Sequence, residues 1–128
     1  MQKIRAYQAN DLTWVEPIAK KYGEWEHART ILASNRLTGA WVIERKAITA
    51  VYKDEHGHVG VGLCNKDGIK ELFKLARKMT TAMTDAGEDV HTHVDKDTWQ
   101  YRMFLKLGYV ESWPDGMLKA YAVHKEVA

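Results

Sequence analysis

The chain has few of the residues that cross-link a protein or interrupt its secondary structure. It contains a single cysteine, Cys64, and two prolines among 128 residues. Because one cysteine cannot form an internal disulfide, we expect a reducing compartment or indifference to redox conditions, and we assign the protein to the cytoplasm. No apolar run approaches the ~20 residues that span a bilayer, and no apolar segment typical of a secretion signal follows Met1. The sequence therefore predicts a soluble protein with no membrane partner.

A strong charge of either sign is also absent. Lys and Arg number 19, Asp and Glu number 17, and the formal net charge is +2. This balance neither requires nor excludes an anionic partner. Nucleic-acid binding would depend on the basic face of one predicted helix alone, so we predict no nucleic-acid partner. The residues of that face are Lys70, Lys74, Arg77 and Lys78.

The length and the hydrophobic pattern predict one domain, residues 1–128, with helices and strands in mixed order. A period of two predicts strands at residues 3–7, 40–45, 48–53, 58–64, 90–94, 109–112 and 117–124. Helical spacing predicts helices at residues 12–22, 25–32, 69–86 and 97–107. Pro17 favours a start of the first helix near Glu16, with a looser turn before it. Turns at residues 46–47, 55–57 and 114–116 indicate a largely antiparallel sheet.

The most informative segment runs from Asp97 to Tyr109. Asp97 can accept hydrogen bonds from the first free backbone N–H groups of a helix, and Gln100 stands where a capping box needs it. Gly108 allows the left-handed turn that ends the helix. Three side chains share one helical face, namely Tyr101, Phe104 and Leu105. The segment therefore predicts a short capped helix that leads directly into a strand.

The end of this segment resembles the C-terminal signature of the GCN5-related N-acetyltransferases, the GNAT family, in which a helix ends in an aromatic-x-Lys-Leu-Gly-Phe run. The matching residues are Phe104, Lys106, Leu107, Gly108 and Tyr109. The opening Ile4-Arg5 and Asn10-Asp11 resemble the family's Ile-Arg…Asp start, and the element order resembles the family's over nearly the whole chain. The resemblance implies an α/β fold of the α+β type, with a mostly antiparallel sheet of about seven strands flanked by about four helices.

The resemblance also implies a function, the transfer of an acetyl group from acetyl-CoA to an amine of a small molecule or a protein. The family holds the pyrophosphate of acetyl-CoA at the start of its central helix, where free N–H groups and the helix dipole favour an anion. Its Arg/Gln-x-x-Gly-x-Gly/Ala pattern corresponds here to residues 65–70. The residues expected to bind the co-substrate are Val61, Leu63, Asn65, Lys66, Gly68, Ile69, Lys70, Asp97 and Phe104.

This phosphate loop departs from the family pattern. Asn65 replaces the Arg or Gln, Lys70 replaces the last small residue, and Asp67 adds a negative charge. In one interpretation Lys66 and Lys70, with Lys74, supply positive charge in place of the lost close backbone approach. In the other, Asp67 caps the helix, the lysines are solvated, and no nucleotide binds.

Acetyl transfer to an amine needs a base, donors for the oxyanion, and an acid for the departing thiolate. Phe104 stands where the family often has a tyrosine acid, so Tyr101 or Tyr109 is the candidate substitute; the alternative is that both are core aromatics. His91 and His93 share one face of their strand and have a pKa suited to proton transfer. They are the candidate bases, unless they simply form the wetter face of a sheet. Further candidates are Glu44 and Glu111.

Three further features have two interpretations each. The same-face pairs His56/His58 and His91/His93 could bind a metal, but no cysteine or carboxylate spacing completes a known pattern, so we predict no metal. Gly60 and Gly62 either admit the arm of the co-substrate or mark a bulge. Trp99 and Trp113 are candidate contacts for a protein partner or a second copy of the chain.

The departures from the family pattern support a second hypothesis. The chain would then be a catalytically inactive protein of the same fold, a binding or structural component such as a phage virion or assembly protein. The two hypotheses predict different structures. The inactive protein has a filled cleft between the fourth and fifth strands, whereas the transferase has an open one beside the start of the helix at residues 69–86.

Overall fold

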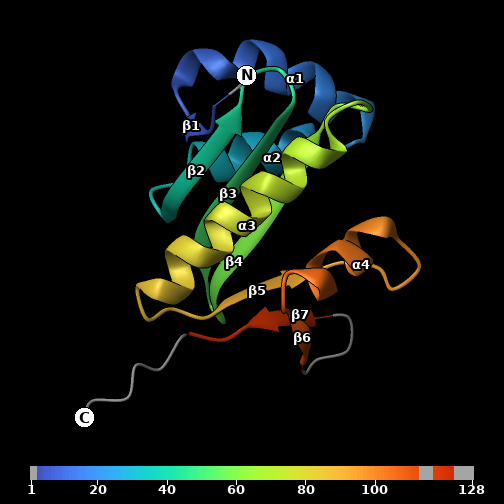
Figure 1. Ribbon diagram of the computed structural model, residues 1–128. Coiled ribbons are helices and arrows are strands. Elements are labelled where there is room, and N and C mark those ends of the chain that lie inside the picture. Colours follow the sequence, from blue (N-terminus) through green and yellow to red (C-terminus); the bar gives the residue numbers. More distant parts are fainter. Residues whose placement is uncertain (1–2, 113–116, 123–128) are drawn as a thin grey trace.

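The computed structural model describes residues 3–112 and 117–122, which form a sheet covered by helices on both faces (Figure 1). The strands are β1 (Arg5–Ala6), β2 (Leu37–Ile43), β3 (Ala47–Asp54), β4 (Gly57–Cys64), β5 (Val90–His93), β6 (Val110–Ser112) and β7 (Met117–Ala120). The helices are the short 3-10 helix η1 (Ala9–Asp11), α1 (Leu12–Lys21), α2 (Trp25–Leu32), α3 (Ile69–Asp85) and α4 (Trp99–Lys106). The predicted order of strands and helices is confirmed.

The seven strands form one sheet in the order β1-β2-β3-β4-β5-β7-β6. The β4–β5 pair is parallel, and the other neighbouring pairs are antiparallel. Within the described residues, β4 and β5 pair only at His58 with Val90 and at Val59 with His91. Beyond these positions β5 turns away from β4 (Figure 1). The predicted α+β class with a mostly antiparallel sheet is confirmed, and the sheet opens where its one parallel pair separates.

Apolar side chains bury the two faces of the sheet under different helices. On one face α1 packs through Val15 against Val42 and Ile48. On the other face α3 and α4 share a larger cluster with the sheet, in which Leu72, Leu75, Tyr101, Met103, Phe104, Tyr109 and Leu118 are buried. Alternation along the strands therefore gives each face its own core.

Glycines on β4 let α3 lie close to the sheet. A methyl group on Gly60 would lie 2.6 Å from Cε of Met79, and one on Gly62 would lie 2.8 Å from Cδ1 of Leu72. The β3–β4 register is continuous from Ala47 opposite Cys64 to Asp54 opposite Gly57. Of the two interpretations of these glycines, the bulge is not found in the β3–β4 register, and helix packing explains the small residues.

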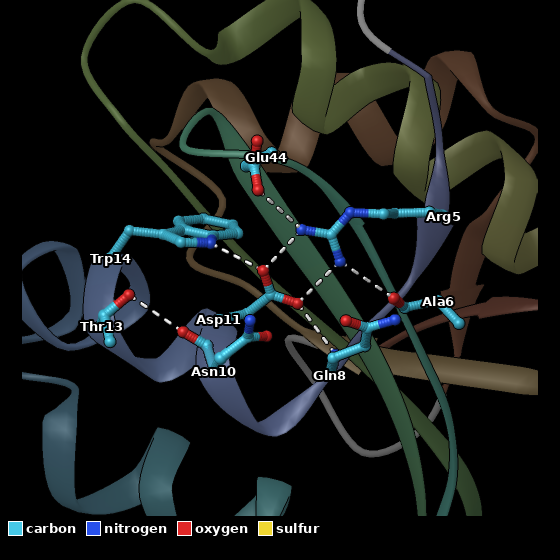
Figure 2. Close-up of polar contacts among 8 residues, drawn as sticks. All are labelled: Arg5, Ala6, Gln8, Asn10, Asp11, Thr13, Trp14 and Glu44. Carbon is cyan, nitrogen blue, oxygen red and sulfur yellow. Dashed lines mark hydrogen bonds and ion pairs between the residues drawn. The ribbon is translucent and has the colours of Figure 1, made fainter.

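A buried carboxylate joins β1 to the start of α1 (Figure 2). Asp11 is 2% exposed and accepts hydrogen bonds from Arg5 Nη1 at 2.9 Å and Nη2 at 2.7 Å. The Gln8 N–H and the Trp14 Nε1–H donate to the same carboxylate, each at 2.8 Å. Arg5 also pairs with Glu44 at 3.1 Å. These contacts give a structural role to the Ile-Arg…Asp opening.

Some predicted boundaries are wrong. α1 begins at Leu12 and contains Pro17, so the helix does not start near Glu16. The N-cap of α4 is Thr98, whose Oγ1 accepts from the Tyr101 N–H, and Asp97 lies before it. Leu105 is 43% exposed and does not share the buried face of Tyr101 and Phe104. The predicted turn at residues 114–116, Trp113 and the last strand beyond residue 122 lie outside the described residues.

A helix that crosses a bilayer must be both long and apolar. Within residues 3–112 and 117–122, no helix is both long enough and apolar enough to cross a bilayer.

Candidate functional site

A cavity of about 660 Å³ opens where β4 and β5 separate. Its strand wall consists of Ile48, Thr49, Ala50, Val61, Gly62, Leu63, Cys64, Thr92 and His93. Helix α2 lines it on one side of the sheet through residues such as His27 and Ile31, and α3 and α4 line it on the other through residues such as Leu72 and Phe104. The cavity therefore passes through the sheet, and the structure has an open cleft between β4 and β5.

The structure brings only some of the predicted site residues to this cavity. The four that line it are Val61, Leu63, His93 and Phe104. The others lie outside its lining: His91, Tyr101, Tyr109, Asn65, Lys66, Gly68, Ile69, Lys70 and Asp97. Thr98 and Trp99, the residues after Asp97, do line the cavity. The lining of the cavity therefore overlaps the predicted site in part.

The two histidines of β5 have different environments although they share one face. His93 is exposed and lines the cavity, whereas His91 is 3% exposed. Their ring centroids are 6.0 Å apart and the rings are nearly perpendicular. Burial lowers the pKa of His91, and the nearby Asp54 carboxylate partly opposes that shift. Of the two, His93 is the one placed to meet a substrate.

The candidate acids Tyr101 and Tyr109 lie in the core beside α4. Tyr109 is 2% exposed, its hydroxyl shares a hydrogen bond of 2.7 Å with Thr80 Oγ1, and burial raises its pKa to about 12. The Tyr101 hydroxyl donates to the Glu111 carboxylate. Phe104 packs edge-on against Tyr109, with 4.8 Å between the ring centroids. These positions match the core-aromatic alternative.

The phosphate loop is anchored to the β2–β3 turn. The Asn65 side chain donates to the Arg45 carbonyl, and the Asn65 N–H donates to the Lys46 carbonyl at 2.8 Å. The Asp67 carboxylate pairs with Lys46 Nζ at 2.5 Å and does not cap α3, so the interpretation in which Asp67 caps this helix is wrong on that point. The Gly68 N–H donates to the Asn65 carbonyl at 2.9 Å and is therefore not free for a ligand.

The start of α3, just after Gly68, is accessible to solvent. Ile69 is 47% exposed, and Lys66 and Lys70 are exposed as well. The first N–H groups of a helix have no carbonyl partner within it. Those of Ile69 and Lys70, with the helix dipole and the two ammonium groups, can therefore attract an anion at this end of α3.

We expect Gly68→Ala to destabilise the protein. A methyl group on Gly68 would collide with the Lys46 carbonyl oxygen, which belongs to the backbone and cannot easily move aside. The expected loss is about 1–3 kcal/mol in the free energy of unfolding, measured by urea denaturation. Lys66→Ala, an exposed change in the same loop, is the control and should stay within about 0.5 kcal/mol of the parent. Equal stability of the two variants would contradict the proposed packing role of Gly68.

Several polar residues of the cavity were not predicted. Glu24 and His27 follow Gly23, whose φ of +69° separates α1 from α2. Gly23 was the one feature of the sequence that could have indicated a change of direction there. Thr49 is 2% exposed, and its Oγ1 lacks a hydrogen-bond partner among the described residues. Asp95, just beyond β5, adds a second carboxylate to the wall.

The side chains that could bind a metal ion are those of His, Cys, Asp and Glu. In the part of the chain that the structure describes, no three such side chains are grouped closely enough to hold a metal ion.

The strand order, the single parallel pair that separates, and the helices on both faces together define the fold of the GCN5-related N-acetyltransferases. One solved structure with this fold is the ribosomal-protein-S18-alanine N-acetyltransferase from Escherichia coli. The match has a TM-score of 0.74, covers 98% of this chain and 97% of that chain, and has 12% sequence identity. At this identity the match establishes the fold alone. No protein-family model and no curated protein sequence matches the chain.

Proposed function

We propose that the chain is an acyltransferase of the GNAT type that moves an acetyl group from acetyl-CoA to an amine. The observation that carries this proposal is the cavity of about 660 Å³ between the separated strands β4 and β5. It lies next to Cys64, at the end of β4 that leads through the loop to the start of α3. A long thioester whose pyrophosphate rests at that helix start would therefore have its arm beside the cavity.

The backbone of β4 suits an amide-containing arm. After Val59 the edge of β4 that faces β5 has no β5 partner among the described residues, so its N–H and C=O groups are available to a ligand. Val61 and Leu63 would flank the arm, and the apolar part of the wall would exclude water from the thioester. Lys66 and Lys70 would attract the phosphates.

The polar groups of the cavity support proton removal from an ammonium group. His93 lines the cavity and would take the proton that the amine must lose before it can attack. Glu24 and Asp95 line the same cavity and would favour a cationic acceptor. A thiolate is a good leaving group, so Phe104 in place of a tyrosine acid is compatible with the reaction.

The acceptor is proposed only as a class, an amine of a small molecule or of a protein. The Escherichia coli enzyme is named for an alanine of ribosomal protein S18, and a protein acceptor would agree with that example. We also propose a cytoplasmic location, with a protein partner or a second copy as a further option. Trp99 is not a candidate for an exposed contact with a partner, because it is half-buried and lines the cavity.

The inactive-protein hypothesis retains specific support. The hydroxyls of Tyr101 and Tyr109 are engaged elsewhere, and Asp67 places a carboxylate beside the proposed phosphate site. An inactive protein of this fold would not turn over acetyl-CoA with any amine. The two functions therefore differ in a binding titration followed by a transfer assay.

Titration with acetyl-CoA in a calorimeter tests the proposal, followed by detection of released thiol with a panel of amines. We expect binding by the parent and an affinity at least about tenfold weaker in Val61→Trp, because the indole would fill the cavity. Val110→Trp is the matched control, since Val110 is 48% exposed and lies outside the cavity lining. Absence of binding by the parent at millimolar acetyl-CoA would refute the proposed function.

A further inference from the structure

Behind His93, on the same face of β5, lies a second imidazole that the proposed function does not use. Alternation along β5 brings His91 and His93 to that face, and the pairing of Val59 with His91 places His91 beside β4. His91 is 3% exposed, yet its Nε2 has no hydrogen-bond partner among the described residues. A buried imidazole nitrogen without a partner is costly, so its retention there needs a reason.

The charged group nearest to this nitrogen is Asp54, at the end of β3. Its Oδ2 lies 3.6 Å from His91 Nε2. Its Oδ1 accepts a hydrogen bond of 2.7 Å from the His56 N–H, so the β3–β4 turn fixes the carboxylate. Asp54 also lines a second cavity, of about 430 Å³, with Tyr52 and Arg36. The carboxylate thus stands between the buried imidazole and an opening on the α2 side.

We propose that His91 and Asp54 are positioning residues that return the proton from His93 to solvent. The inference depends on the proposed function, because it takes His93 as the base. An N–H bond of the acceptor ammonium breaks and an N–H bond to His93 forms, which leaves the amine lone pair free to attack the thioester. The imidazolium then releases its proton through His91 to water beside Asp54. The His91 and His93 rings lie edge to face with 6.0 Å between their centroids, so the two imidazoles are direct neighbours on this route.

Four titratable groups lie around His91. Asp54 faces it from β3, His56 from the β3–β4 turn with a centroid separation of 6.5 Å, and His93 from β5. Lys119 on β7 is directly opposite His91, and its ammonium pairs with Asp89 at 3.5 Å. Burial lowers the pKa of His91, which favours its uncharged form, and the Asp54 carboxylate partly opposes that shift.

The histidine ring resonances, followed by NMR over a pH series, test the inference without activity. We expect Asp54→Asn to lower the pKa of His91, since loss of a nearby negative charge disfavours the imidazolium. Glu88→Gln is the matched control: Glu88 lies 3.4 Å from His58 Nε2, as Asp54 lies 3.6 Å from His91 Nε2. It should leave the His91 titration unchanged. A His91 titration unaltered in Asp54→Asn would overturn the inference.

Kinetics give the second readout. Asp54→Asn and His91→Gln should each lower kcat about tenfold with KM for acetyl-CoA unchanged, and Asp54→Asn should move the rising limb of the kcat–pH profile to lower pH. The double variant should be no slower than His91→Gln, because both changes interrupt one route. If the His91→Gln variant does not fold, the Asp54→Asn variant still tests the route, because Asp54 is partly exposed. Losses of kcat that add up in the double variant, or a rising limb of the kcat–pH profile that does not move, would refute the route. A parent that transfers no acetyl group would refute the proposed function instead.

Discussion

Replacement of His93 by glutamine is expected to lower kcat for acetyl transfer by about 100-fold or more, the usual contribution of a positioned base. Glutamine keeps the size and polarity of the side chain but cannot take a proton near neutral pH. Because His93 lines the cavity, whose lining does not include the proposed phosphate-binding residues 65–70, the affinity for acetyl-CoA should not change. Steady-state assays with a responsive amine measure kcat, and calorimetry measures the affinity.

His27→Gln is the control for this experiment. His27 also lines the cavity, but from α2, and we assign it no proton transfer. Its replacement should change KM for the amine while kcat stays within about threefold. A His93→Gln variant with parental kcat would show that another group removes the proton, and Glu24 or Asp95 would become the candidate.

The second large effect is expected at Asp11, where replacement by alanine should cost about 2–4 kcal/mol in the free energy of unfolding. Four donors on Arg5, Gln8 and Trp14 bond to this buried carboxylate. The variant leaves the Gln8 N–H and the Trp14 indole without their acceptor (Figure 2). Urea denaturation at pH 7 measures the loss. Asp67→Asn, at an exposed ion pair, is the control and should leave the urea midpoint close to that of the parent.

The same carboxylate predicts a pH dependence. The hydrogen bonds from Arg5, with those from Gln8 and Trp14, lower the pKa of Asp11 from 3.8 to about 2. The folded protein therefore holds this proton less tightly than the unfolded chain. The stabilisation is fully present above the unfolded pKa and is lost as the pH falls from about 4 to about 2. Asp11→Asn should lack this component of the acid transition, and an identical transition in parent and variant would contradict the assignment.

The sequence predicted the order of elements because each is marked locally. Alternation from residue 40 onwards, the apolar stripe of α3 and the glycine after α4 are local patterns of a few residues. Boundaries were less predictable. Asp97 and Thr98 are both good caps, and only the fold of the preceding loop, where Thr98 Oγ1 also donates to the Asp95 carbonyl at 2.7 Å, selects Thr98.

The candidate site was less predictable because its residues meet only in the folded chain. Alternation placed His91 and His93 on one face, but nothing in the sequence shows that Asp54 and the turn cover His91 while His93 stays open. The sequence did not indicate that the Tyr109 hydroxyl would form a hydrogen bond with Thr80, which lies 29 residues earlier in the chain. Gly68 fitted a phosphate-loop pattern, yet its contact with the Lys46 carbonyl explains the glycine as well.

The short β4–β5 pairing has a consequence for how the two halves of the sheet are oriented. Within the described residues, β5, β7 and β6 join β1–β4 at two residue pairs, and otherwise through side chains such as Met103 and Phe104 of α4. The angle between the halves is thus set by the volumes of those side chains more than by backbone bonding. A core substitution there would widen or narrow the mouth of the cleft while every individual strand ladder stayed intact.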